Sequence, residues 1–596
     1  MSPRALEEEP AATVSAMLSP EAVLTPLVSA AIARAFGSEF HDADPVLRPS
    51  QFADIQVNAA LALAKRLGQT PRDAATRIVD ELEVTSVCSA VEISGPGFIN
   101  LTLNDAWIAA QVMAAAADPR TGVPSEPARR IVIDYSAPNV AKEMHVGHLR
   151  TTIVGDSLAR TLEHLGHNVV RQNHVGDWGT PFGMLIAHLD DVGADSEEAR
   201  LVETDPNVFY QAARVKFDKD ADFARRARAS VVSLQAGDDK AMATWHRLVD
   251  LSRSYFHAVY RLLGVTLTDA DLAGESTYND DLPRVCEELL DAGIATMSAG
   301  ALCVFLDGYT GREGKPTPLI VRKSDGGYGY ATTDLATVRR RVRDLRADQM
   351  IYVIGVTQSL HLEMVWATAR LANWLPPAVT PVHLQIGSVL GEDRKIMRTR
   401  QGGELKLMAL LQEAVAAARA ILDEHRDSLD EETRATIAPQ VGIAAVKYAD
   451  LSVAHDSDYV FDLQRMVAPV GNTGPYLQYQ AARVHSIFRS SGLDPADPAV
   501  TSAPIIVALP EERALCLALL ELGPTVVETG RLLEPHRLCA YLYSLAQAFS
   551  VFYERCPVLR TDDDDVRAGR LALCALTLRA LTTGLDLLGI EAPERM

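Results

Sequence analysis

Residues 131–148 read IVIDYSAPNVAKEMHVGH, and this stretch decides the fold that we expect around it. Its first five residues form a short apolar run, which is typical of a buried strand in a parallel sheet. A Ser-Ala-Pro-Asn turn follows, and residues 149–165 then carry apolar side chains at helical spacing. The sequence therefore predicts a strand, a turn and a helix, with the HVGH tetrapeptide at the helix N-terminus.

The HVGH tetrapeptide has the parts of a nucleotide site. Backbone N–H groups and the helix dipole favour phosphate at a helix N-terminus. Gly147 leaves room for a flat base or ribose, and the imidazoles of His145 and His148 can donate hydrogen bonds to phosphate oxygens. Two other interpretations stay open: histidines that only cap or pack the helix start, or a metal site that adds His174 and Asp177. Zinc-binding histidine pairs on helices favour a spacing of i, i+4, so the pattern fits ATP better than a metal.

Further strands are predicted on the C-terminal side of this unit. The candidates are residues 167–174, 350–355 and 384–389, with amphipathic helical stretches between them. Such alternation favours a parallel α/β sheet. The charged stretches 212–229 and 240–263 have helical patterns and lie in a long interval between two of these strands, so we interpret that interval as an insertion.

The two ends of the chain have different patterns. Strand-like residues 90–93 and 98–103 among helical segments predict a small N-terminal α+β domain, whereas the chain from about residue 404 onward predicts a helical bundle. The helices expected there are 404–424, 448–461, 476–489, 511–533, 536–553 and 567–588. The predicted parts are a loose segment over 1–20, the α+β domain over 21–122, the α/β domain over 123–403 with a helical insertion at about 190–300, a helical connection over 404–445 and the bundle over 446–596.

Composition limits the classes of function. A formal net charge of −21 argues against wholesale attraction to nucleic acid, so RNA would have to bind at a local basic stripe. The seven cysteines form no CxxC pair, so we expect reduced core thiols and no protein-bound zinc. Charged residues or glycine interrupt the apolar stretches before the ~20 residues that a membrane helix needs. Because the N-terminus is also acidic, unlike a signal region, we expect a cytoplasmic protein.

The central stretch resembles an enzyme family. Residues 134–142, DYSAPNVAK, followed by HVGHLR at 145–150, are similar to the segment that opens the catalytic domain of bacterial-type class I arginyl-tRNA synthetases, whose HIGH motif holds ATP. Residues 174–179, HVGDWG, resemble the next block of that family, and the similarity continues to residues 594–596. The HIGH-like motif here comprises Ala137, Pro138, Asn139, Val140, Ala141, Lys142, Glu143, Met144, His145, Val146, Gly147 and His148.

The resemblance implies a fold and a reaction. The fold is multidomain: a Rossmann-like α/β catalytic domain, an N-terminal α+β domain that meets the tRNA elbow, and a C-terminal all-α anticodon-binding bundle. The reaction is the activation of L-arginine with Mg²⁺-ATP and its transfer to tRNA-Arg by a monomeric enzyme. In this family, activation commonly needs bound tRNA.

A second cationic element is needed opposite the HVGH motif, because activation develops charge on phosphate oxygens. Residues 395–403, KIMRTRQGG, occupy the place of the family's KMSKS loop but depart from its sequence. Lys395, Arg398 and Arg400 keep positive charge, and which of them contacts phosphate stays open, as does a merely solvated basic loop. The resemblance implies His145, His148, Lys395 and Arg398 as catalytic residues, and His145, Gly147, His148, Gly355, His361, Met397 and Arg398 as ATP-binding residues.

Recognition of arginine requires a carboxylate for the guanidinium group and a neutral acceptor or aromatic ring beside it. Tyr330 and Asp334 lie four residues apart at the start of a predicted helix, where they can share one face. By resemblance these two grip the guanidinium, although Asp334 could instead be a simple N-terminal helix charge, and Asp134 could simply end its strand. The arginine-binding residues that the resemblance implies are Asp134, Asn139, His145, Tyr330, Asp334 and Gln358.

The C-terminal region is similar to the family's anticodon-binding domain. Aromatic rings and arginine there can stack on unpaired bases, although most of the tyrosines could instead be bundle core. The predicted tRNA-binding residues are Tyr459, Asn472, Tyr476, Gln478, Tyr479 and Arg483. The arginine cluster at 339–343 could contact phosphate or form a solvated helix face. The altered loop at 395–403 also leaves a rival open: a synthetase-like protein that binds RNA or arginine without efficient charging, or a second copy with altered inhibitor sensitivity.

Overall fold

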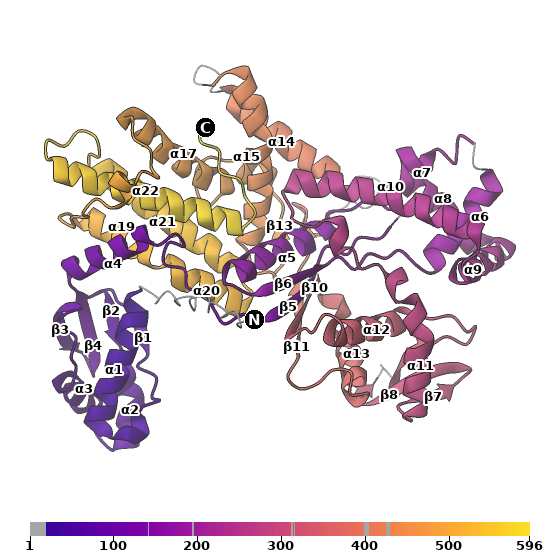
Figure 1. The fold of residues 1–596 in the computed structure, drawn as a ribbon, viewed down its shortest axis with the longest axis horizontal. Coiled ribbons are helices and arrows are strands. Elements are labelled where there is room, and N and C mark those ends of the chain that lie inside the picture. The colour runs from indigo at the N-terminus through magenta and orange to yellow at the C-terminus, as the bar shows by residue number, and fades with distance from the viewer. Residues whose placement is uncertain are drawn as a thin grey trace, which may run out of the picture.

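The computed structural model describes residues 19–140, 142–193, 196–310, 314, 316–397, 405–424 and 429–596. Figure 1 shows a central sheet with the C-terminal helices above it, the N-terminal domain on one side and two further groups of elements on the other. Ala141, Arg398 and Arg400, as well as most of the loose N-terminal segment, lie outside the described residues. The α/β, α+β and all-α classes predicted from the sequence are confirmed.

The N-terminal domain is a four-stranded antiparallel sheet with helices. Its strands run in the order β1-β2-β4-β3, and the predicted strands at 90–93 and 98–103 fall within β3 and β4. The elements are α1 (Pro20–Phe36), β1 (Leu47–Pro49), β2 (Ile55–Val57), α2 (Ala59–Leu67), α3 (Pro71–Asp80), β3 (Cys88–Ser94), β4 (Phe98–Leu103) and α4 (Asp105–Ala117), with a 3-10 turn at Ser38–Phe40.

The central sheet is parallel, with the order β11-β10-β5-β6. Its strands are β5 (Arg130–Asp134), β6 (Asn168–Gln172), β10 (Gln349–Gly355) and β11 (Thr380–Ile386), and the helix that carries the tetrapeptide is α5 (Gly147–His164). Successive side chains of β5 pack on opposite faces of the sheet. Ile131 and Ile133 belong to the buried cluster that contains α5, whereas Val132 belongs to a second buried cluster. Burial on both faces explains why this strand is apolar throughout.

The insertion begins with helices. These are α6 (Thr180–Val192), α7 (Leu201–Thr204), α8 (Pro206–Lys219), α9 (Ala221–Gln235) and α10 (Asp239–Leu263). The helical stretch expected at 212–229 is two helices, because Asp220 caps α9 and its carboxylate accepts from the N–H groups of Asp222 and Phe223 at 2.8 and 3.1 Å.

An antiparallel sheet that the sequence analysis did not predict follows the insertion helices. Its strands run in the order β7-β8-β9, and it packs with α11 and α12. The sheet and these helices lie at the lower right of Figure 1. The elements of this region are 3-10 turns at Asp269–Asp271 and Glu275–Asp281, α11 (Leu282–Asp291), β7 (Ala295–Ser298), β8 (Ala301–Thr310), β9 (Pro316–Arg322), α12 (Tyr330–Arg343), a 3-10 turn at Val356–Gln358, and α13 (Ser359–Leu371).

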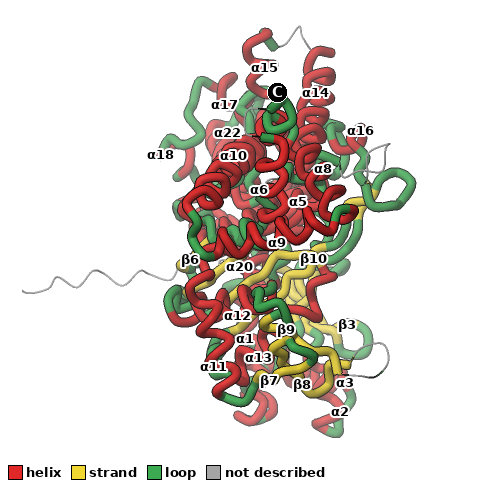
Figure 2. Tube along the Cα trace, turned by 90° about the vertical axis from the view of Figure 1, so that its right-hand side faces the viewer, coloured by secondary structure: helices red, strands yellow, loops and turns green. Residues whose placement is uncertain are grey.

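The C-terminal region is helical, as predicted. Its helices are α14 (Leu407–Glu424), α15 (Glu431–Leu451), α16 (Leu463–Met466), α17 (Gly474–Ser491), α18 (Pro498–Thr501), α19 (Pro510–Leu520), α20 (Leu522–Leu532), α21 (Pro535–Arg555) and α22 (Asp564–Leu587). Figure 2 shows these helices stacked on one side of the strands. The stretch 511–533 is divided between α19 and α20.

The helix predicted over 448–461 is wrong. Helix α15 ends at Leu451, and β13 (Tyr459–Val460) pairs in parallel with β12 (Val389–Leu390). The intervening residues read SVAHDSD, and Ser and Asp favour turns by bonding to nearby backbone. His455 fixes this turn to the end of β11, because its ring bonds to the Gln385 carbonyl at 2.8 Å and its own carbonyl accepts from Gly387 N at 2.8 Å.

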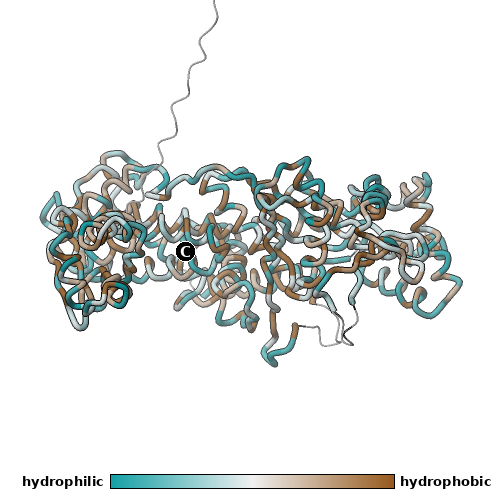
Figure 3. Tube along the Cα trace, turned by 90° about the horizontal axis from the view of Figure 1, so that it is seen from below, coloured by the Kyte–Doolittle hydropathy of each residue, from teal (hydrophilic) through white to brown (hydrophobic). Residues whose placement is uncertain are grey.

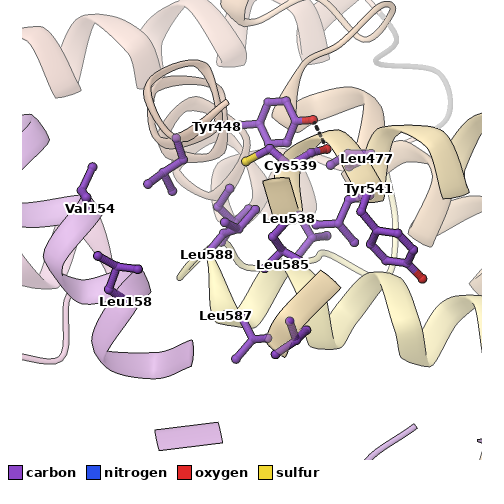
Figure 4. Packing of buried hydrophobic residues seen from close by; sticks show 14 of the residues in the cluster. Val154, Leu158, Tyr448, Leu477, Leu538, Cys539, Tyr541, Leu585, Leu587 and Leu588 are labelled. Atoms are coloured by element: carbon purple, nitrogen blue, oxygen red, sulfur yellow. Dashed lines mark hydrogen bonds between the residues drawn. The ribbon is translucent and has the colours of Figure 1, made fainter. Parts of the chain in front are cut away.

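One apolar core joins the central sheet to the helical bundle. Figure 4 shows Val154 and Leu158 of α5 beside the packed side chains Leu587 and Leu588, and all four belong to the same buried cluster. The colouring of Figure 3 places many hydrophilic residues in the outer loops of the elongated molecule. All seven cysteines are buried. No helix in the described part of the chain is long and apolar enough to span a bilayer.

Candidate active site

The turn after β5 has an unusual backbone. Ser136 and Ala137 have φ angles of 71° and 45°, a left-handed region that costs non-glycine residues about 1–3 kcal/mol each. Buried hydrogen bonds hold it: the hydroxyls of Ser136 and Tyr260 lie 2.7 Å apart, and Ala137 N donates to Asn173 Oδ1 at 3.0 Å. Asn173 in turn donates to the Tyr260 hydroxyl at 3.0 Å. The turn brings Asn139 to an exposed position beside Gly176, with which it forms a parallel bridge.

The two histidines of the tetrapeptide are oriented by backbone groups. Gly147 N donates to His145 Nδ1 at 3.0 Å, and His145 N donates to His148 Nδ1 at 3.1 Å. Since both Nδ1 atoms accept, the ring proton of each neutral imidazole lies on Nε2. Burial and the neighbouring His145 lower the pKa of His148 to about 3, so this ring stays neutral at physiological pH. The prediction that α5 starts at the tetrapeptide is confirmed, because its first residue is Gly147.

A cavity of about 1060 Å³ opens at this helix start. His145 and Gly147 line one side, and Gly355 and Met397 line the other. This volume is enough for a nucleotide. His361, which is predicted to bind ATP, lies against Asp334, as described below.

The segment after the basic loop is fixed to the tetrapeptide. His145 and Lys406 form an antiparallel bridge, in which Val146 N donates to Leu405 O at 3.0 Å. The Lys406 ammonium also pairs with Glu143 at 2.6 Å. Lys395 lies exposed at the start of the loop, in a turn where its carbonyl accepts from Gly391 N. The described residues on both sides of the loop, Met397 and Leu405, line the cavity.

The predicted guanidinium-binding residues lie on one helix. Tyr330 begins α12 and is 70% exposed, and Asp334 lies one turn later. Asp334 Oδ2 lies 2.6 Å from His361 Nε2, and this hydrogen bond raises the pKa of His361. Gln358 is exposed in the 3-10 turn before α13. The carboxylate of Asp334 is therefore held in place by a cationic or hydrogen-bonding histidine.

Asp134, which is predicted to bind arginine, forms an ion pair with Arg341. Its Oδ2 accepts from Arg341 Nη2 at 2.6 Å, and both side chains are buried. The other oxygen, Oδ1, is buried without a hydrogen-bond partner among the described residues. Asp134 therefore does more than end its strand, and only one of its oxygens is available to a substrate amine.

The sequence analysis missed one acidic residue. Glu275 lines a second cavity, of about 320 Å³, together with Trp178, Tyr330 and Thr333. Burial, followed by the nearby Asp177 and Asp334, raises the pKa of Glu275 to about 8. No motif surrounds Glu275, so only the fold reveals that it approaches Asp334. The charged residues that line this cavity are Glu275, Asp325, Arg228 and Lys323, and Glu275 is the carboxyl group in it that a cationic ligand would favour in its ionised form.

Comparisons with known proteins agree over nearly the whole chain. Residues 111–463 match the family "tRNA synthetases class I (R), catalytic domain", residues 477–596 match "DALR anticodon binding domain", and residues 22–103 match "Arginyl tRNA synthetase N terminal domain". The chain belongs to the class I arginyl-tRNA synthetases. It is thus an enzyme of the ligase class, an aminoacyl-tRNA synthetase.

Individual relatives of this synthetase support the same assignment. The arginine–tRNA ligase of Thermobifida fusca is 63% identical over 580 residues, which cover 97% of this chain and 100% of the relative. That of Frankia casuarinae is 52% identical, with 96% and 97% covered. The arginyl-tRNA synthetase structure from Plasmodium falciparum superposes with a TM-score of 0.81 at 27% identity, covering 98% of this chain and 100% of that one.

The synthetase's predicted RNA-binding residues are only partly accessible. Tyr479 is 39% exposed, and the guanidinium carbon of Arg483 lies 4.8 Å from the centre of its ring and 5.3 Å from that of Tyr553. Asn472 is exposed, and Tyr476 is half-buried.

Two of the predicted RNA-binding residues face inward. Tyr459 is buried beneath Arg150, and Gln478 is buried and donates to the Glu591 carbonyl at 2.6 Å. Neither residue lies on the surface that Tyr479 and Arg483 form. Tyr459 is buried on β13, which agrees with the alternative interpretation that tyrosines here are core residues, and Gln478 is buried on α17.

The arginine cluster at 339–343 is divided: Arg343 is exposed, as a solvated helix face would have it, whereas two other members are not. Arg339 and Arg341 are buried, and they pair with Glu288 and Asp134 respectively. Their function in the described structure is to anchor α12 to the sheet and to α11.

Proposed function

We propose that this synthetase activates L-arginine with ATP and transfers it to the 3′ end of tRNA-Arg. The observation that carries the proposal is the pair of cavities: one is nucleotide-sized and begins at His145 and Gly147, and the other is lined by Glu275 and Tyr330 near Asp334. The strained turn beside Asn139 belongs to the same catalytic domain. A reaction between an amino acid and ATP needs two such sites side by side.

The carboxylates select the side chain of arginine. Asp334 and Glu275 neutralise the guanidinium group, and the ring of Tyr330 covers it. Asn139 and Gln358 bind the amine and carboxylate of the amino acid, together with the available oxygen of Asp134. The raised pKa of Glu275 supports this assignment, because a cation would restore the charged form of a carboxyl that burial disfavours.

Positioning and charge stabilisation supply the catalysis. The carboxylate of arginine attacks the α-phosphate in line and pyrophosphate leaves, so no covalent enzyme nucleophile is needed. His145 and His148 donate from Nε2 to phosphate oxygens. Lys395 and Arg398 are the proposed sources of positive charge for the phosphates. Mg²⁺ enters as the partner of ATP, since it binds substrate phosphates while keeping several waters.

The helical domain is proposed to bind the anticodon through Asn472, Tyr476, Tyr479 and Arg483. The three family matches support the predicted domains over 21–122, 123–403 and 446–596. Family membership also supports the proposal that the protein is a cytoplasmic monomer. Analytical ultracentrifugation would measure the mass of the species in solution.

The decisive substitution is Asp334→Asn. Exchange of labelled pyrophosphate into ATP, with arginine and tRNA present, should fall by about 10²–10⁴, because loss of one member of a buried charge pair costs about 3–5 kcal/mol. Asp344→Asn, an exposed aspartate just after the same helix, is the matched control and should exchange at the wild-type rate. An Asp334→Asn enzyme within a few-fold of wild type would refute the assignment.

A further inference from the structure

Lys447 of α15 is a fully buried lysine, at 0% exposure, that the proposed reaction does not use. Its ammonium donates to Leu263 O at 2.8 Å and to Gly589 O at 2.5 Å. Leu263 is the last residue of α10, so the ammonium sits at a helix C-terminus, where a cation is favoured. Lys447 therefore joins the helical domain to the insertion.

Residue 589 leaves room for this ammonium group because it is a glycine. Gly589 has φ +65°, and a Cβ atom there would lie 2.6 Å from Lys447 Nζ and 3.4 Å from Asp156 Oδ2. Asp156, on α5, is also completely buried. Burial alone would raise its pKa, but Lys447 and Arg160 hold it below the ordinary value. A buried cation of the helical domain thus faces a buried anion of the catalytic domain.

Two groups near the Lys447 ammonium connect to the strained turn after β5: Leu263, whose carbonyl accepts from it, and Asp156, whose direct partners include Arg160 and Thr266. Asp156 accepts from the Tyr135 hydroxyl at 3.2 Å, and Tyr135 directly precedes the left-handed Ser136. Leu263 lies three residues after Tyr260, on the same helix, and the Tyr260 hydroxyl bonds to Ser136. Two short paths therefore run from one ammonium group to the backbone that places Asn139.

The neighbouring residue faces the proposed RNA-binding side of the same helix. The Tyr448 hydroxyl donates to Asn472 Oδ1 at 2.6 Å and to Cys539 O at 2.9 Å, the second of which is drawn in Figure 4. Two adjacent residues of α15 thus have different neighbours: Lys447 contacts the end of α10, and Tyr448 contacts Asn472, a proposed RNA-binding residue.

We propose that Lys447 is a positioning residue, which couples the helical domain to amino-acid activation by holding Asp156 and the end of α10 behind the turn at 135–137. This inference rests on the proposed function. It predicts that loss of the ammonium lowers the rate of the chemical step, while the binding of tRNA is retained, because the RNA-facing residues are unchanged.

The test compares Lys447→Met with the double variant Lys447→Met/Asp156→Asn, in pyrophosphate exchange at saturating tRNA. Both variants should lose about 10–100-fold in kcat, as expected for misplaced reacting groups, with the tRNA dissociation constant within twofold of wild type. The double variant removes both buried charges, so its Tm should recover toward wild type. If kcat recovers with Tm, Lys447 is merely structural and the proposal is overturned.

A milder variant and a control complete the test. Tyr135→Phe removes only the hydroxyl that joins Asp156 to the turn, and it should lower kcat several-fold. A Tyr135→Phe enzyme with wild-type kcat would overturn the proposal whichever way the double variant behaves. Arg513→Met breaks another ion pair between domains, with Asp54 at 2.6 Å, and should lower Tm without lowering kcat. Wild-type exchange is measured first, so its absence would refute the proposed function and not the coupling.

Discussion

Glu275 makes the proposed arginine pocket sensitive to pH. Its pKa of about 8 means that the empty pocket holds a protonated carboxyl at neutral pH. A guanidinium ion favours the ionised form, so arginine binding should release a proton below pH 8. Affinity for arginine should therefore rise with pH up to about 8 and then level off.

Calorimetry would measure this proton release. Titration with arginine at pH 7, in two buffers with different ionisation enthalpies, should give heats that differ for wild type. Glu275→Gln should remove the difference that this carboxyl causes. Equal wild-type heats in the two buffers would contradict the assignment of Glu275 to the pocket.

At the scale of residues, local chemistry was predictable and long-range neighbours were not. The helix start at HVGH could be predicted, because glycine, histidine and the preceding strand are contiguous in sequence, and α5 does begin at Gly147. Glu275 carries no such signal, since its neighbours Asp177 and Asp334 are distant along the chain. His361 was expected at ATP, and only the packing of α13 on α12 places it against Asp334.

At the scale of elements, the bridge between the tetrapeptide and the segment at 405–407 sets one side of the nucleotide cavity. Lys406→Met removes its ion pair with Glu143, and the half-exposed pair contributes at most about 1 kcal/mol. The KM for ATP in pyrophosphate exchange should therefore rise by about two- to fivefold, because RT ln 10 is about 1.4 kcal/mol.

The matched control for this change is Lys240→Met. That lysine also makes a 2.7 Å ion pair, with Asp190, but it lies at the exposed start of α10. Its KM for ATP should stay at the wild-type value. Equal effects of the two substitutions would mean that the bridge does not shape the cavity.

Element prediction succeeded where a single periodicity dominated and failed where turn chemistry interrupted it. The parallel strands β5 and β10 are apolar on both faces and were recognised from that pattern. The helix expected at 448–461 was wrong, because the polar turn after Leu451 was read as a continuation of the apolar spacing. The sheet β7-β8-β9 was not predicted, although β8 spans ten residues, because the interval between the predicted strands at 167–174 and 350–355 was interpreted as an insertion from its helical stretches.

At the scale of the whole molecule, an acidic enzyme must bind RNA locally. With a net charge of −21, attraction to tRNA depends on the few cations that face it. Arg483, stacked between Tyr479 and Tyr553, is the best placed in the helical domain. Tyr479→Ala should weaken tRNA binding by about 1–3 kcal/mol, the value of one base stacked on an aromatic ring.

Filter binding at fixed salt would measure this loss. Phe305→Ala provides the control, because Phe305 is a similarly exposed aromatic residue on β8, outside the helical domain. If both variants bind tRNA as tightly as wild type, the surface formed by Tyr479 and Arg483 is not the RNA-binding face.

The most direct test of the central claim is the transfer of radiolabelled arginine to tRNA by the purified enzyme with Mg²⁺-ATP. We predict label on tRNA-Arg with arginine and none with citrulline, because a pocket built for a charged guanidinium rejects a neutral analogue by about 10⁴–10⁵. Tight binding of tRNA without transfer of arginine would contradict the account and favour the rival, a synthetase-like protein that binds but does not charge.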